Sequence, residues 1–68
     1  MINELPNGAT IIRQEHSKGG SVYLCDTESG PTPYVTWIAP AHNRTATESG
    51  DYFVDLESAN KRYLERIK

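Results

Sequence analysis

Residues 55–67 read DLESANKRYLERI, and this segment carries the clearest periodicity in the chain. Its small and apolar residues recur at spacings of three and four, which is typical of one face of a helix. This stripe consists of Leu56, Ala59, Asn60, Tyr63, Leu64 and Ile67. Asp55 directly precedes the stripe and is a favourable N-cap residue. We therefore predict a C-terminal helix that starts after Asp55 and buries this stripe.

Short runs typical of strands lie upstream of this helix. Residues 9–15 and 21–27 flank a turn with two glycines, which indicates a hairpin. Residues 34–39 and 50–54 read as two further strands, joined by the long polar connection 40–49. The sequence thus predicts an α+β fold, in which a small antiparallel sheet of three to four strands carries the C-terminal helix on one face.

Length and composition limit the classes of protein that remain. The 68 residues, 37% of them hydrophobic, are enough for a single domain spanning residues 1–68. No run approaches the roughly 20 apolar residues of a membrane span, and the N-terminus lacks the pattern of a signal peptide. We expect a soluble, cytoplasmic protein without membrane contact.

Residues that could carry chemistry do not form a recognisable set. His16, His42, Cys25 and Asp51 lack the short spacings of metal sites, and a lone cysteine excludes an internal disulfide. A chain of this size also has little room for a catalytic pocket, which usually takes about 300 Å³ or more. We expect no catalytic residue, no metal and no cofactor, and therefore no enzyme.

The aromatic residues are the most informative feature. The strand at residues 34–39 is apolar on both faces, yet a single helix can cover only one face of a sheet. If the face of the sheet that carries Leu24 lies under the helix, then Tyr23, Val35 and Trp37 form an exposed patch on the other face. The predicted binding residues are Tyr23, Val35, Trp37 and Tyr52, with Glu48 and Asp51 at an acidic rim. Two alternatives to a binding face stay open. The tyrosines could line an ordinary solvent-exposed face with hydrated hydroxyls, and Trp37 could be a residue of the hydrophobic core.

One segment carries a resemblance to a known family. The run from Gly50 to Tyr63 resembles the last strand and helix of the plant ethylene-response-factor DNA-binding domain. It is similar in the same way to the N-terminal arm-binding domains of tyrosine integrases. In both, a capping residue precedes Ala by four positions and an aromatic residue by eight, as Asp55, Ala59 and Tyr63 do here. The resemblance implies a three-stranded sheet that enters the DNA major groove through basic and aromatic strand residues.

Charge separates the two functional hypotheses. Residues 1–60 are acidic on balance and offer Arg13 as the strand arginine, whereas the helix end, 61–68, is basic. We expect a non-catalytic protein-interaction module that binds a protein partner or a second copy through its aromatic sheet face. In size and style it is similar to small phage or mobile-element open reading frames, which suggests a phage-type modulator of a larger protein. The alternative is a nucleic-acid-binding domain that uses the sheet aromatics and the basic helix end, although acidic strands disfavour it.

Overall fold

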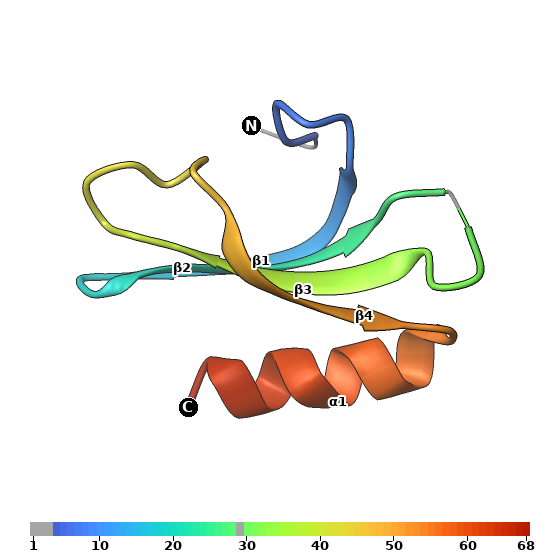
Figure 1. Cartoon of the computed structure of the whole chain (residues 1–68). Coiled ribbons are helices and arrows are strands. Elements are labelled where there is room, and N and C mark those ends of the chain that lie inside the picture. The colour runs from blue at the N-terminus through green and yellow to red at the C-terminus, as the bar shows by residue number, and fades with distance from the viewer. Residues whose placement is uncertain (1–3, 29) are drawn as a thin grey trace.

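The computed structural model describes residues 4–28 and 30–68, and this part of the chain contains four strands and one helix. The elements are β1 (Thr10–Ser17), β2 (Gly20–Asp26), β3 (Tyr34–Ala39), β4 (Glu48–Phe53) and α1 (Leu56–Arg66). The strands form one antiparallel sheet in the order β1-β2-β3-β4. Helix α1 packs along one face of this sheet (Figure 1). The predicted α+β fold is confirmed.

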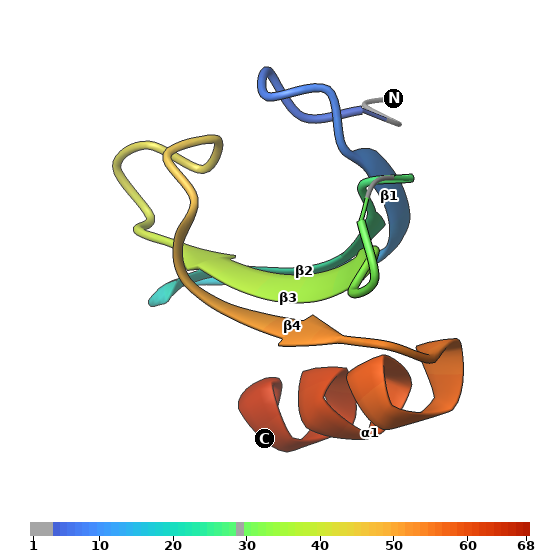
Figure 2. The same cartoon turned by 45° about the vertical axis from the view of Figure 1, so that its right-hand side comes forward.

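The sheet is curved, so its two faces differ in shape. Figure 2 shows α1 against the outer side of the curve, which we call the convex face. On the inner side, the concave face, the N-terminal arm (residues 4–9) and the loop between β3 and β4 (residues 40–47) rise at opposite ends. The concave face is therefore flanked by irregular segments, whereas the convex face is covered by a regular helix.

The strand bounds differ from expectation mainly at β4. Pairing with β3 extends back to Glu48, which lies opposite Ile38, although the polar character of Glu48 and Ser49 predicted a loop there. The register shifts between Thr36 and Ile38, and Ser49 adopts a left-handed backbone with φ of 55°. These features describe a β-bulge, in which an extra residue interrupts the ladder without ending it. The polar residues Glu48 and Ser49 therefore belong to β4, because the bulge lets the strand resume its pairing with β3.

Helix α1 begins as predicted but is rotated about its axis. The Asp55 carboxylate accepts a hydrogen bond from the backbone N–H of Ser58 at 3.2 Å, so the predicted N-cap is confirmed. Ala59 and Tyr63 are the buried residues of the helix, whereas Leu64 is 39% exposed. The expectation that the whole stripe is buried is wrong, because Leu56, Leu64 and Ile67 are all exposed.

The rotation of α1 has an electrostatic explanation. Arg62 and Arg66 lie on the side of α1 that faces β4, where both contact Asp51. At roughly 100° per residue, Leu64 lies about 120° from the midpoint of Ala59 and Tyr63, on the side away from these arginines. Bringing the arginines to β4 therefore turns Leu64 towards solvent. Leu56 and Ile67 are exposed because they lie at the two ends of the helical segment.

The helix covers the face of the sheet that carries Leu24, one of the two arrangements that the sequence left open. Leu24 is fully buried against Ala59 and Tyr63 of α1, and three partly buried residues complete this cluster: Val22, Tyr34 and Phe53. Thr36 also lies on the convex face, where it is completely buried. Its hydroxyl has no hydrogen-bond partner among the described residues. The convex face thus holds an apolar cluster with one unsatisfied polar group inside it.

Candidate binding site on the concave face of the sheet

The concave face is covered to a large extent, contrary to the expectation of an exposed patch. Tyr23 is 3% exposed, Val35 is fully buried and Trp37 is 8% exposed. They belong to a second core cluster with Cys25 and Ala39, to which Leu5 and Ala9 of the N-terminal arm contribute. The expected exposure of Tyr23, Val35 and Trp37 is therefore wrong, because chain segments outside the sheet cover them. Their role in binding stays a prediction.

The N-terminal arm is folded back by its own hydrogen bonds. The N–H of Leu5 donates to the carbonyl of Ala9 at 2.9 Å, and the N–H of Gly8 donates to the carbonyl of Leu5 at 2.9 Å. The side-chain oxygen of Asn7 accepts from the N–H of Ala9 at 3.0 Å. This tight turn carries Leu5 and Ala9 onto the sheet. Leu5 is a single leucine in a polar segment, so no periodic pattern of apolar residues predicted that it packs on the sheet.

The loop at the other end is held by Arg44. Its guanidinium donates to the carbonyls of Gly20 and Ser17 at 3.0 and 2.9 Å, and to the hydroxyl of Ser21 at 3.0 Å. The hydroxyl of Tyr23 in turn donates to the carbonyl of Arg44 at 2.6 Å. The polar composition of residues 40–49 predicted a loop without apolar side chains to hold it on the sheet. The groups that hold it, the guanidinium of Arg44 and the hydroxyl of Tyr23, are polar instead. No local pattern in the sequence links Arg44 to residues more than twenty positions upstream.

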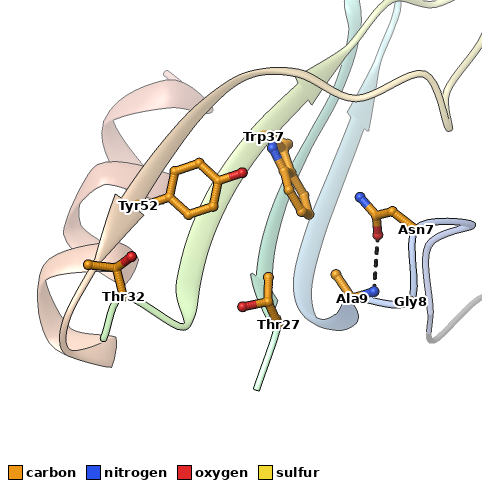
Figure 3. A pocket seen from close by; sticks show the side chains of 7 residues that line it. All are labelled: Asn7, Gly8, Ala9, Thr27, Thr32, Trp37 and Tyr52. Carbon is orange, nitrogen blue, oxygen red and sulfur yellow. Dashed lines mark hydrogen bonds between the residues drawn. The ribbon is translucent and has the colours of Figure 1, made fainter. Parts of the chain in front are cut away.

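A hollow remains between the arm and β4. It has a volume of about 420 Å³ and is lined by Asn7, Gly8, Ala9, Thr27, Thr32, Trp37 and Tyr52. In Figure 3, Trp37 and Tyr52 extend from β3 and β4 towards the side chains of the arm. The hollow therefore contains two of the four predicted aromatic-face residues. Tyr23 and Val35 belong to the core beneath the same face.

The two rings in the hollow have a defined relative geometry. The centroids of Trp37 and Tyr52 lie 6.3 Å apart, with an angle of 89° between the ring planes. The indole of Trp37 rests on Gly50, where a Cβ atom would come within 2.6 Å of the indole nitrogen. Gly50 thus allows the nitrogen edge of the indole to approach β4 closely. The perpendicular tyrosine, 55% exposed, then forms a second wall.

The polar groups of the hollow are neutral, and they include the hydroxyls of Thr27, Thr32 and Tyr52, which can donate and accept hydrogen bonds. The indole nitrogen of Trp37 lies close to Gly50 of β4. Asn7 uses its amide oxygen for Ala9, so its NH₂ group is the end that remains available. None of the lining side chains named above carries a formal charge. The hollow can therefore offer neutral donors, neutral acceptors and aromatic surface to a ligand, without ionic contacts.

The two predicted acidic residues lie on the other face of the sheet. The carboxylate of Asp51 accepts hydrogen bonds from Arg62 at 2.8 Å and from Arg66 at 2.7 Å. The hydrogen bond from Arg62 is the largest cause that holds the pKa of this carboxyl below its ordinary value, and the same bond raises the pKa of Arg62. Glu48 pairs with Ile38 on the convex face, beside Arg66. The expected acidic rim of the aromatic face is thus absent in the described residues.

Other reactive groups do not assemble into a centre. Cys25 is buried, and burial raises the pKa of its thiol to about 12. Within residues 4–28 and 30–68, no three His, Cys, Asp or Glu side chains are grouped so that they could hold a metal ion. The single helix of this part is also too short and polar to cross a bilayer. The hollow on the concave face is therefore the candidate site that we develop further.

No protein-family model, curated protein or solved structure matches this chain. The similarity of residues 50–63 to DNA-binding domains thus stays a prediction, and functional arguments rest on the geometry of the site.

Proposed function

We propose that this chain is a non-catalytic protein-interaction module that binds its partner through the hollow on the concave face. The observation that carries this proposal is the hollow between the arm and β4, where the ring of Tyr52 is 55% exposed beside the largely buried Trp37. Tryptophan and tyrosine are enriched among the residues that dominate binding energy at protein interfaces. An exposed tyrosine held against a fixed tryptophan is suited to anchor a partner segment.

The surroundings of the hollow support recognition of a segment rather than of a flat surface. The arm and the 40–47 loop stand above the sheet at opposite ends (Figure 2), and the hollow is lined by the arm and by Tyr52 of β4. A partner that reaches the hollow has to place part of its chain against the arm. A phage-type modulator that captures a segment of a larger cytoplasmic protein fits this arrangement. A second copy of the chain is the competing occupant, and it would have to present an exposed segment of its own.

The alternative of nucleic-acid binding draws less support from the charges. Arg62 and Arg66 at the basic helix end are both engaged by Asp51. Arg13, the strand arginine, donates to the side chain of Asn60 at 2.9 Å and lies over the ring of Tyr63. These three arginines serve the convex face, whereas phosphate contacts need cations free to replace counterions. The aromatic hollow itself has no cationic lining residue.

Site-specific crosslinking tests the proposal. The photocrosslinker p-benzoylphenylalanine replaces Tyr52 in one variant and the exposed Lys61 of α1 in a control variant, both expressed in source cells. We expect a protein adduct from position 52 and none of the same mass from position 61. The captured protein, once purified, should bind the wild-type chain directly, and Tyr52→Ala should weaken that binding by about tenfold or more.

Three outcomes would contradict the proposal. The first is equal adducts from both positions, and the second is a purified partner that binds the Tyr52→Ala variant as well as the wild type. The third is an adduct that nuclease removes, together with binding that falls steeply between about 50 and 200 mM salt, which would favour nucleic acid. An adduct of twice the chain mass would identify the partner as a second copy.

A further inference from the structure

We propose that Asn7 is a site of spontaneous deamidation, and that its conversion releases the N-terminal arm from the concave face. Asparagine is a thermally labile residue, because the backbone nitrogen of the next residue can attack its side chain. Here the next residue is Gly8, and both residues are exposed where they line the hollow. The reaction needs only water, so it does not depend on the partner that the hollow binds.

The reaction is an attack of the backbone on the side chain. The backbone nitrogen of Gly8 loses its proton to solvent base and forms a bond to Cγ of Asn7. The bond between Cγ and the side-chain NH₂ group then breaks, and this group takes up a proton and leaves as ammonia. The product is a cyclic succinimide. Water opens this ring at either of its carbonyls, which gives aspartate or isoaspartate.

The hydrogen bond between Asn7 and Ala9 favours this attack. The side-chain oxygen of Asn7 accepts from the N–H of Ala9 at 3.0 Å, so the side chain is folded along the backbone that follows it. A donor on this oxygen also stabilises the negative charge that develops there when Cγ is attacked, as donors of an oxyanion hole do. Gly8 has no Cβ atom to hinder the approach of its nitrogen. The electrophile is thus activated and the nucleophile is unhindered.

The docked arm opposes the same attack. The N–H of Gly8 donates to the carbonyl of Leu5 at 2.9 Å, so the attacking nitrogen first has to give up this hydrogen bond. The side chain of Leu5 is 2% exposed in the concave cluster, and its packing holds the turn closed. Deamidation therefore proceeds from the open state of the arm, and its rate follows the population of that state.

Conversion to isoaspartate makes the open state permanent. The main chain of isoaspartate runs through the former side-chain carbonyl, so the backbone gains an extra carbon and the turn from residue 7 to Ala9 is lost. Leu5 and Ala9 can then no longer be carried together onto the sheet. A new carboxylate also lies among lining side chains that have no formal charge, where no cation compensates it. Aspartate, in contrast, keeps an acceptor for Ala9, so isoaspartate is the product that undocks the arm.

Two asparagines elsewhere in the described residues serve as internal controls. Asn43 makes the same kind of turn, because its side-chain oxygen accepts from the N–H and the hydroxyl of Thr45 at 3.4 and 3.2 Å. Asn43 is exposed as well, but it is followed by Arg44, whose Cβ atom hinders the backbone nitrogen. Asn60 lies within α1, where the helix holds the backbone. Asn43 therefore isolates the effect of glycine, and Asn60 that of regular structure.

Incubation in water enriched in heavy oxygen tests the proposal. The purified chain is kept at mildly alkaline pH and physiological temperature, and peptide mapping by mass spectrometry locates each new carboxyl. We expect Asn7 to convert about tenfold faster than Asn43 or more, with isoaspartate as the main product. Leu5→Ala loosens the turn and should accelerate conversion of Asn7 about fivefold or more, without accelerating Asn43. Leu64→Ala, on the opposite face of the molecule, should convert like the wild type.

The fluorescence of Trp37, the sole tryptophan, reports whether the arm is docked. Trp37 belongs to the cluster that the arm covers, so its emission should shift to longer wavelengths as isoaspartate accumulates. The backbone amides of the arm should then exchange faster, while α1 keeps its protection. Asn7→Ser is the matched control, because its hydroxyl can accept from Ala9 but it has no amide to lose. Its fluorescence should stay unchanged during the same incubation.

Several results would overturn the proposal. The first is equal conversion of Asn7 and Asn43 in the wild type. The second is a Leu5→Ala variant in which Asn7 converts no faster, or in which Asn43 accelerates equally, because opening of the arm would then not limit the reaction. The third is isoaspartate at position 7 that leaves the fluorescence and the exchange of the arm unchanged, because the arm would then stay docked. A fluorescence shift of the same size in Asn7→Ser would also contradict it.

Discussion

The two faces of the sheet are covered by different means, and the difference explains where the candidate site lies. On the convex face, α1 satisfies its own backbone hydrogen bonds and needs only Ala59 and Tyr63 to meet the sheet. On the concave face, the cover consists of an arm and a loop: Asn7 accepts from the backbone of the arm, and the guanidinium of Arg44 fastens the loop to carbonyls of the β1–β2 hairpin. Irregular segments can be fixed only where such anchors exist. The cover is therefore incomplete, and a hollow remains.

The largest expected difference in stability is between variants of two neighbouring residues on α1. Tyr63→Ala should cost about 3–5 kcal/mol, because it empties the centre of the convex cluster, and so small a fold should then largely unfold. Leu64→Ala should cost less than about 1 kcal/mol, because its side chain lies outside that cluster. Thermal and urea melts of both variants measure the difference. Similar losses in the two variants would show that the helix docks through the wider stripe.

A second pair of neighbours compares the faces directly. Val35 and Thr36 are both fully buried, on the concave and the convex face respectively. Thr36→Val removes an unsatisfied hydroxyl at nearly constant shape and should stabilise the chain by about 1 kcal/mol. Val35→Thr adds such a hydroxyl to an apolar cluster and should destabilise by about 1–3 kcal/mol. Urea unfolding decides, and a destabilised Thr36→Val variant would mean that the hydroxyl has a partner in solution.

The third test concerns the cover of the concave face. Arg44→Ala removes three hydrogen bonds that the guanidinium makes to residues 17–21, at a cost of about 1–2 kcal/mol. Amide exchange across residues 40–47 should accelerate, while the helix should keep its protection. The control is His42→Ala, an exposed position of the same loop. If exchange in the loop is the same in both variants, Arg44 does not hold the cover in place.

The smallest effect is expected from the ion pairs on the convex face. The hydrogen bond from Arg62, with the nearby charge of Arg66, lowers the pKa of Asp51 from 3.8. The ionised carboxylate therefore contributes stability at neutral pH, and this contribution is lost as the pH falls through the lowered pKa. Asp51→Asn should reduce the melting temperature slightly at pH 7 and converge with wild type in strong acid. Glu4→Gln serves as the control, and an equal pH dependence in both variants would contradict the assignment.

The sequence was most informative where the structure depends on interactions between residues that are close together in the chain. Asp55 predicted the helix start because a cap is a local interaction, and the alternation in residues 34–39 predicted β3 with its correct bounds. The phase of the sheet did not follow, because residues 34–39 are apolar on both faces. The structure places Leu24 and Thr36 on the helix side. Local patterns thus predicted the regular elements, but not which face of the sheet the helix covers.

The second core and the hollow could not be predicted, because they depend on contacts between distant residues. Leu5 reaches the sheet through a turn in a polar segment, and Arg44 binds residues more than twenty positions away. Trp37 and Tyr52 were predicted to lie on one face, but the segments that bury Trp37 and leave Tyr52 exposed were not predicted. The rotation of α1 was missed for the same reason, because Asp51 attracts Arg62 and Arg66 from another element.

The bulges in the two outer strands have a consequence for assembly. A regular outer strand can template the addition of further chains, which is the first step towards fibrils. Here β1 changes register between Ile11 and Arg13, and β4 does so next to Ser49, whose carbonyl also accepts a hydrogen bond from Arg66. Edge-to-edge growth is thereby discouraged on both sides. The molecule can therefore keep the exposed ring of Tyr52 beside the hollow without inviting aggregation along its edges.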